Sequence, residues 1–403
     1  MKMIALKAFF YRYRYIILVP ILSAVFFLIA LRTVDPVEYP NSDFFTFWLA
    51  GHMAIAGQNP YSSDLWISGH HQFGAIWIPN AMFIYPLPLS LLFAPLGALP
   101  LYQAFVIWVW LSQLMIIAAL VLLLKIYPTP LIKRYLLPLI AGMVLFRPTI
   151  LTIAHGQLSG FLLFVIAGVV YLWEREKYWQ GALLLSILVL KPNLGIPIAA
   201  LLSVYLLLKK KITPIVAEFA AGFALILIGL VQNPHWISEF WAAGNTKLSQ
   251  TFGFSPTIWG MSAFFCNYKL NCTVRFGGFF GLLLLLGYLY WLVRNHKILS
   301  PAMAAGLAIC VTLSLTPYTW IYDQILLIVP IVALIIGLGH AGDRFLPTAL
   351  VFLLIDIFAF FLLDITGKIQ KEIWNAAIPL LVMSLLFWFI SKERRKYQVG
   401  GTP

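Results

Sequence analysis

Long apolar segments recur along most of this sequence, each close to the length that crosses a lipid bilayer. The hydrocarbon core of a bilayer offers no hydrogen-bond partners, so a spanning segment must be a helix of ~20 apolar residues. Only 10% of the 403 residues are charged, against ~25% in an ordinary soluble domain. The sequence therefore predicts an all-helical polytopic membrane protein, with residues 1–403 as one integral membrane domain. It excludes a soluble enzyme, a disordered chain and a disulfide-rich secreted module.

We expect twelve membrane spans along the chain. They are predicted at 15–31, 101–124, 135–150, 158–173, 180–190, 194–208, 212–232, 276–293, 300–316, 321–339, 345–363 and 373–390. The first span has no small-residue cleavage site after it and is expected to be a signal anchor. Residues 180–208 form a single apolar run that Lys191-Pro192-Asn193 interrupts, so we expect a hairpin of two short helices with a protein-buried bend.

The basic residues set the predicted orientation. With the N-terminus in the cytoplasm, most of the 27 Lys and Arg residues fall in cytoplasmic loops, as the positive-inside rule requires. Both termini are then cytoplasmic, and the protein is expected in the plasma (inner) membrane. The net charge of +13 is explained by this asymmetry, and no nucleic-acid partner is expected.

Two long loops fall on the extracytoplasmic side. The first, 32–100, contains an amphipathic stretch from Asp43 to Gly57 and the Pro-rich stretch 83–100, which we expect to lie in the interface or to re-enter the membrane. The second, 233–275, contains Cys266 and Cys272, which could form a disulfide in an oxidising compartment or remain two free thiols.

Polar groups at membrane depth are costly and point to function. In the predicted topology they gather at the outer ends of spans: Asp43, Arg147, His155, Gln157, Lys191, Tyr318, Tyr322 and Asp323. Asp43 suits either a helix cap or a general base. A phosphate would suit Arg147 and the helix start after His155, but Arg147 could instead snorkel and His155 could be a hydrogen-bonded histidine of the fold. Lys191 needs a counter-charge, which a bound phosphate or a nearby Asp would supply.

Several chemistries have no motif here. The sequence has no GxxxxGK[ST], HExxH or GxSxG motif, and its His residues are scattered. We expect no metal and no cofactor. A hydrophobic donor carrying its own phosphate would explain both the basic groups at depth and the lack of a nucleotide-sugar domain.

Four blocks in this order resemble the polyprenyl-phosphate-mannose-dependent α-mannosyltransferases, membrane enzymes of the GT-C fold. The blocks are SDFFTFWLAGHMAIAGQNPY (42–61), FIYPLPLSLLFAPLGALP (83–100), HGQLSGFLLF (155–164) with GALLLSILVLKPNLG (181–195), and SLTPYTWIYDQILLIVP (314–330). The resemblance implies transfer of one sugar, mannose above all, from a polyprenyl phosphate to a glycolipid or glycan hydroxyl at the outer face, with inversion. Its partners would be that donor, the acceptor and the membrane lipids.

The resemblance also implies residue roles. Asp43 would be the general base. The donor phosphate would be bound by Arg147, His155, Gln157 and Lys191, and the sugar or acceptor by Trp48, His52, Tyr85, Tyr318, Trp320, Tyr322 and Asp323. The fourth block lacks the His residues that familiar members carry there, so Tyr322 or Asp323 must substitute. A transporter or lipid flippase is the alternative from another class, and an oligosaccharide ligase is a further transferase; one interrupted helix without a matching second one disfavours the transporter.

Overall fold

The computed structural model describes residues 19–35, 39–75, 83–340, 361 and 372–399. All regular structure in these ranges is helical. The elements of the first half are a helix Val19–Thr33, η1 Tyr39–Asn41, α2 Asp43–Ile55, α3 Ser63–Gln72, α4 Leu87–Gly97, α5 Leu101–Leu124, α6 Thr129–Leu145, α7 Arg147–Ala154, α8 Ser159–Trp173, α9 Tyr178–Leu185, η2 Ser186–Leu190 and α10 Pro192–Leu208. The second half contains α11 Ile212–Gln232, α12 Trp236–Thr251, η3 Phe252–Phe254, α13 Ile258–Phe265, α14 Leu270–Asn295, α15 Pro301–Leu315, η4 Ile321–Leu327, α16 Ile328–His340, η5 Glu372–Ala376 and α18 Ala377–Val399.

Four of the described helical segments are long and apolar enough to cross a membrane by themselves. They are α5, α11, α14 and the segment Glu372–Lys392. The other described apolar helices have 10–17 residues, so the expected count of twelve spans is not confirmed. The predicted span 345–363 lies outside the described residues apart from position 361, and residues 15–18 of the first span lie outside them entirely.

Two predicted spans differ from the helices in the structure. The stretch 135–150 is not one helix, because α6 ends at Leu145 and α7 begins at Arg147. Pro148 lies in the first turn of α7, where its missing N–H costs nothing, whereas inside a continuous helix it would break a hydrogen bond. The second difference is α14, which begins at Leu270 instead of 276.

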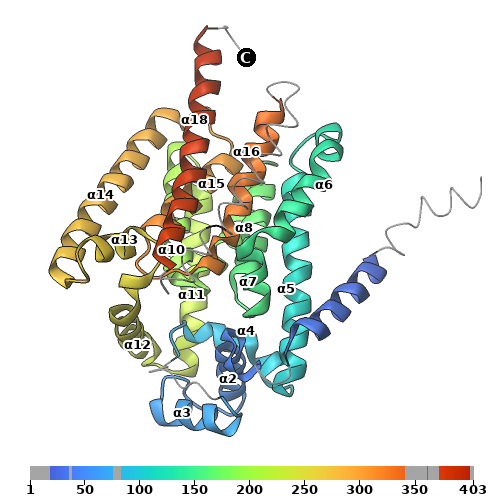
Figure 1. Ribbon diagram of the computed structural model, residues 1–403, viewed down its shortest axis with the longest axis vertical. Helices are drawn as coiled ribbons and strands as arrows, with labels where there is room; N and C mark the ends of the chain where they lie inside the picture. Colours follow the sequence, from blue (N-terminus) through green and yellow to red (C-terminus); the bar gives the residue numbers. More distant parts are fainter. Residues whose placement is uncertain (1–18, 36–38, 76–82, 341–360, 362–371, 400–403) are drawn as a thin grey trace, which may run out of the picture.

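The core of the protein is a bundle around α8 and α15. Nearly every side chain of α15 is buried, and α15 packs against α10, α16 and α18 (Figure 1). The peripheral helices α11 and α14 instead expose large apolar side chains, such as Phe219 and Phe223 on α11 and Leu282 on α14. In water such surfaces would be unfavourable, but they suit helices that face lipid.

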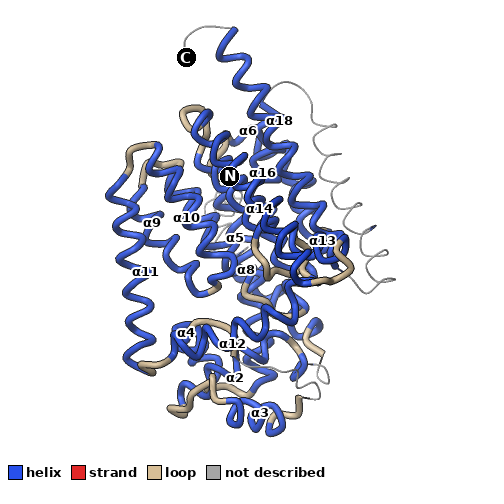
Figure 2. The backbone as a smooth tube through the Cα atoms, turned by 90° about the vertical axis from the view of Figure 1, so that its left-hand side faces the viewer, coloured by secondary structure: helices blue, strands red, loops and turns tan. Residues whose placement is uncertain are grey.

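The two expected outer loops lie at the same end of the molecule. Figures 1 and 2 both show α2, α3, α4 and α12 together at the end opposite to the C-terminal part of α18. Helices α2 and α4 touch through glycines, because a Cβ on Gly51 would lie 2.5 Å from the Phe93 carbonyl oxygen and one on Gly97 2.3 Å from the His52 nitrogen. Cys266 and Cys272 form a disulfide with an S–S distance of 2.03 Å, linking the end of α13 to the first turn of α14.

The interrupted run 180–208 folds as two short helical segments. The first, α9 continued by η2, ends at Leu190, and α10 begins at Pro192. A Cβ on Gly195 would lie 1.8 Å from the Leu188 carbonyl oxygen, so the two segments approach too closely at the bend for a larger residue at this position. Lys191 stands at this bend and is only 2% exposed, so the bend is buried in protein.

Candidate functional site

Asp43 is the first residue of α2, and a turn between α7 and α8 holds it in place. The Phe44 N–H donates to the His155 carbonyl oxygen at 3.1 Å, and the Trp108 indole N–H donates to the Gly156 carbonyl oxygen at 2.8 Å. Gly156 has φ +64°, and a Cβ there would lie 2.6 Å from the Phe44 Cβ. This turn therefore packs directly against the start of α2.

The Asp43 carboxylate is not used as a helix cap. Ser42 is the N-cap residue of α2 and makes no side-chain cap hydrogen bond. Among the described residues, none donates a hydrogen bond to the Asp43 side chain. A carboxylate that is partly exposed and not committed to the fold is available to accept a proton.

Three tyrosines from distant segments lie around this carboxylate. Burial raises the pKa of Tyr318 to about 12, and the Asp43 and Asp323 carboxylates add to this effect. Burial also raises the pKa of Tyr85, with the same two carboxylates contributing. Asp43 and Asp323 act electrostatically on Tyr322 as well. The structure thus brings together candidates from three of the sequence blocks, and the Tyr85 and Tyr318 hydroxyls remain protonated donors at neutral pH.

Lys191 and Asp323 form a buried ion pair. The Lys191 Nζ lies 2.5 Å from Asp323 Oδ1, and the two side chains are 2% and 1% exposed. The same oxygen accepts a hydrogen bond from the Ser159 hydroxyl at 2.6 Å. The other oxygen accepts bonds from the Thr319 hydroxyl and the Trp320 N–H, at 2.9 and 3.1 Å. The counter-charge of Lys191 in this structure is therefore an Asp.

Arg147 belongs to a second polar cluster. Its Nη1 donates to Asn375 Oδ1 at 3.4 Å, and the Glu372 carboxylate attracts it electrostatically. Asn375 also accepts a bond from the Gln324 amide through its carbonyl oxygen. Arg147 and His155 stand at opposite ends of α7, which puts them roughly 12 Å apart along the chain. The structure therefore does not place Arg147 beside Asp43.

The other donor candidates lie in the α7–α8 turn. His155 is exposed, and its ring centroid is 6.5 Å from that of Tyr322. Gln157 is 1% exposed, and its side-chain oxygen has no hydrogen-bond partner among the described residues. His155 is thus close to Tyr322, and Gln157 is a buried polar side chain of the same turn.

Trp48 and His52 lie in the contact between α2 and α4. The Trp48 indole N–H donates to the Leu99 carbonyl oxygen at 3.0 Å, and His52 Nδ1 lies 2.9 Å from the Gly97 carbonyl oxygen. Their rings stack with centroids 5.1 Å apart. Trp48 is five residues after Asp43 and hence about 140° around the helix from it. The Trp48 indole N–H and His52 Nδ1 thus both contact main-chain carbonyl oxygens.

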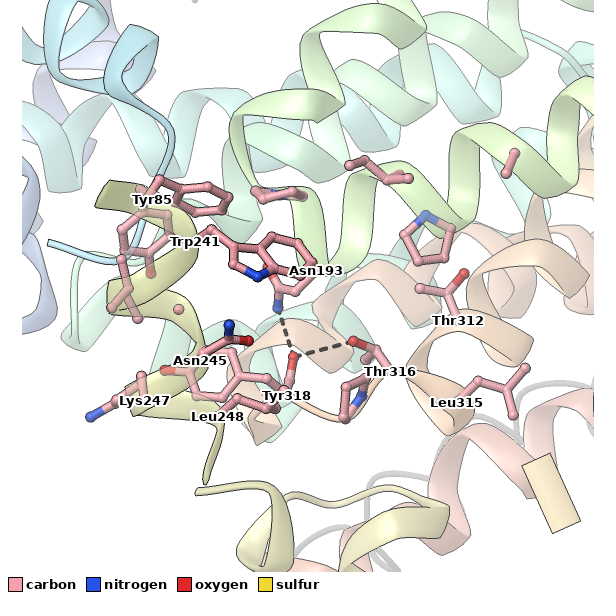
Figure 3. A pocket seen from close by; sticks show the side chains of 18 of the residues that line it. Tyr85, Asn193, Trp241, Asn245, Lys247, Leu248, Thr312, Leu315, Thr316 and Tyr318 are labelled. Atoms are coloured by element: carbon pink, nitrogen blue, oxygen red, sulfur yellow. Dashed lines mark hydrogen bonds between the residues drawn. The ribbon is translucent and has the colours of Figure 1, made fainter. Parts of the chain in front are cut away.

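A cavity of about 670 Å³ lies beside the tyrosine cluster, between α10, α12, α14 and α15. Its polar lining residues gather toward one end, where Figure 3 shows Tyr85, Asn245, Lys247 and Tyr318. The Asn193 amide donates to the Tyr318 carbonyl oxygen at 2.7 Å there. Apart from Thr312 and Thr316, the remainder of the lining is mostly apolar and includes Ile196, Pro197, Leu201, Leu285, Val311 and Leu315. The cavity therefore suits a ligand with one polar end and a long apolar part.

Sequence reasoning did not identify Lys247. This residue of α12 lines the cavity, and burial lowers the pKa of its ammonium group while the Asp43 carboxylate partly offsets that shift. One signal was present in the sequence. Basic residues are disfavoured in extracytoplasmic loops, so a Lys in the loop 233–275 needs a reason to be there.

The comparison with known families bears on the region that lines this cavity. The family model for glycosyltransferase family 87 matches residues 83–317, more than half of the chain. The chain belongs to glycosyltransferase family 87. No curated protein matches it.

The family assignment makes the chain a membrane glycosyltransferase, which uses a sugar donor and an acceptor. The matched region includes the second and third sequence blocks, Lys191 and Lys247, and it ends just before Tyr318. Asp43 precedes it. Among the residues that the structure describes in this glycosyltransferase, no group of three or more His, Cys, Asp or Glu could hold a metal ion.

Proposed function

We propose that this glycosyltransferase transfers one sugar, mannose by its resemblance, from a polyprenyl-phosphate donor to a hydroxyl of a glycolipid or glycan at the outer face of the membrane, with inversion. One observation carries the proposal: an apolar cavity has its polar end beside a carboxylate that the fold leaves uncommitted. Figure 3 shows this polar end, and the Asp43 carboxylate acts on Tyr85, Tyr318 and Lys247 there.

The shape and chemistry of the cavity favour a lipid-linked donor. Side chains of α10, α14 and α15 supply its apolar wall, and these helices belong to the apolar part of the chain. A prenyl chain would bury its hydrocarbon against this wall, at about 25 cal/mol for each Å² removed from water. The phosphate and sugar would then occupy the polar end, near Asp43 and the tyrosines.

A single displacement is the reaction that this arrangement supports. Asp43 accepts the proton of the acceptor hydroxyl while the oxygen of that hydroxyl bonds to the anomeric carbon. The bond from that carbon to the phosphate oxygen breaks, and its electron pair leaves with the polyprenyl phosphate. Attack opposite to the leaving group inverts the anomeric configuration through an oxocarbenium-like transition state. The protonated tyrosines Tyr85, Tyr318 and Tyr322 can donate hydrogen bonds to sugar oxygens.

The experiment that tests this role compares Asp43→Asn with Asp64→Asn in lipid nanodiscs. Asp64 also lies in the first turn of an outer-loop helix, α3, and serves as the matched control. With radiolabelled polyprenyl-phosphate mannose and a membrane-lipid extract as acceptor, Asp43→Asn should lower the transfer rate about 10²- to 10⁴-fold, the usual contribution of a general base. Asp64→Asn should retain the wild-type rate. Equal rates for wild type and Asp43→Asn would reject Asp43 as the base.

A further inference from the structure

We infer that Lys247 binds the phosphate of the lipid donor and that Lys191 instead positions the loop carrying Tyr318 and Tyr322. This inference rests on the proposed function, because it assigns the anionic end of the donor to one side chain of the same cavity. It differs from the roles implied by the resemblance, which made Lys191 a phosphate ligand and gave Lys247 no role.

Two of the basic groups singled out in the sequence, Lys191 and Arg147, already have polar partners within the fold. Lys191 is paired with Asp323 at 1–2% exposure, so a phosphate at Lys191 would have to displace a buried carboxylate. Arg147 donates to Asn375 and lies in the field of Glu372. Separating a buried ion pair leaves an uncompensated charge, which is strongly unfavourable. Lys191 is therefore not free to bind an anion, and Arg147 already donates to an amide away from the cavity lining.

Lys247 differs from both in its surroundings. It is partly buried on the wall of the cavity, and no described residue accepts a hydrogen bond from its ammonium group or forms an ion pair with it. The described part of the chain thus leaves this cation with room for a bound anion. A Lys ammonium is a compact point charge suited to a phosphate oxygen.

The position of Lys247 relative to Asp43 suits the displacement. The two groups influence each other electrostatically, yet they make no ion pair among those found between described residues. Attacking oxygen and leaving phosphate must lie on opposite sides of the anomeric carbon, so base and phosphate ligand must be separated by the sugar. A base and a cation that are near each other but not in contact meet this requirement.

Hydrogen bonds near the start of helix α12 hold this helix beside the cavity. The Glu239 carboxylate accepts hydrogen bonds from the Asn59 amide at 3.1 Å and from the Asn233 amide at 2.7 Å. These bonds connect α12 to the first outer loop and to the end of α11. Lys247 lies two turns further along the same helix, about 80° around its axis from Glu239. The place of α12, and with it the position of Lys247 on the cavity wall, is therefore set by contacts that involve both outer loops.

Comparing the binding of a short lipid phosphate with that of its uncharged alcohol distinguishes the contribution of the Lys247 charge from that of the apolar lining. The titration uses farnesyl phosphate and farnesol with the full-length protein in nanodiscs, for wild type, Lys247→Met, Lys247→Arg and the control Lys269→Met. Lys269 is an exposed lysine of the same outer loop. Lys247→Met should weaken farnesyl phosphate binding about tenfold or more, the usual effect of one charge-assisted hydrogen bond, and leave farnesol binding unchanged. Lys247→Arg should restore phosphate binding, and Lys269→Met should behave as wild type.

Three results would overturn the inference. They are wild-type farnesyl phosphate affinity in Lys247→Met, an equal loss of farnesol affinity in that variant, and a wild type that binds the phosphate no better than the alcohol. The outcome is separable from that of the proposed function. A loss specific to farnesyl phosphate in Lys247→Met, with no sugar transfer by the wild type, would support the phosphate site and reject the transfer reaction.

Discussion

Replacing Lys191 with Met should destabilise the protein strongly and not merely weaken donor binding. The substitution keeps the length and apolar stem of the side chain but removes the charge that neutralises Asp323. Asp323 would remain 1% exposed with its bonds from Ser159, Thr319 and the Trp320 N–H. Three neutral donors do not replace a counter-charge in a medium of low dielectric constant.

The expected size follows from the burial of the pair. Removing one partner of a buried ion pair costs about 3–5 kcal/mol in the free energy of unfolding. Asp323→Asn should be costly for the same reason, because it leaves the Lys191 ammonium buried. The double variant Lys191→Met/Asp323→Asn removes both charges and should cost less than the two single changes together, with a coupling free energy of roughly 2–3 kcal/mol.

The assay is equilibrium unfolding of the four proteins in one detergent mixture, with farnesyl phosphate titration of whatever remains folded. The control is Lys269→Met, which should unfold as the wild type does because Lys269 is exposed. A stable, folded Lys191→Met that lost only phosphate affinity would refute the reasoning, and it would return Lys191 to the donor site. Additive effects of the two single substitutions would likewise show that the pair is not coupled.

Three further predictions concern the turn, the pH dependence and the orientation. Gly156→Ala should lower the free energy of unfolding by about 2–4 kcal/mol, because Ala is strained at φ +64° and its Cβ would lie 2.5 Å from the Phe105 ring; thermal unfolding measures this, and wild-type stability would show that the turn can relax. Because burial lowers the pKa of Lys247, its charge and with it farnesyl phosphate affinity should be lost with rising pH below the ordinary Lys range, while Lys247→Arg keeps its affinity there; parallel pH profiles would contradict this. A membrane-impermeant maleimide should label Ser249→Cys in intact cells and Lys210→Cys only after lysis, and the reverse pattern would invert the predicted topology.

The helical architecture could be predicted because the signal is local. Hydropathy located α5 and α11 to the residue, and the Lys191-Pro192 interruption marked the bend between η2 and α10. The division of 135–150 into α6 and α7 was missed, since its apolar run continues through Phe146 and the effect of Pro148 depends on where the helix begins. Four long helices among shorter ones could not be foreseen either, because hydropathy measures apolar length and not where a helix ends.

Several candidate residues singled out in the sequence lie near one another in the structure, but their pairing could not be predicted. Asp43, Tyr85, Tyr318 and Asp323 were all singled out as polar or aromatic residues near the outer face, and the structure gathers them. The partner of Lys191 could not be chosen, because Asp323 is 132 positions away in the chain and a phosphate satisfies the same electrostatic need. Lys247 was not singled out because its place on the cavity wall depends on how α12 packs in three dimensions, which hydropathy does not reveal.

The proposed reaction requires that the sugar arrives on a lipid phosphate, and an experiment that offers two kinds of donor tests this requirement. Purified protein in nanodiscs receives a membrane-lipid acceptor with either radiolabelled polyprenyl-phosphate mannose or radiolabelled GDP-mannose. We expect label in a new glycolipid from the polyprenyl-phosphate donor alone, and we expect excess unlabelled polyprenyl phosphate to suppress that transfer. Transfer from the nucleotide sugar, with none from the lipid donor, would contradict it.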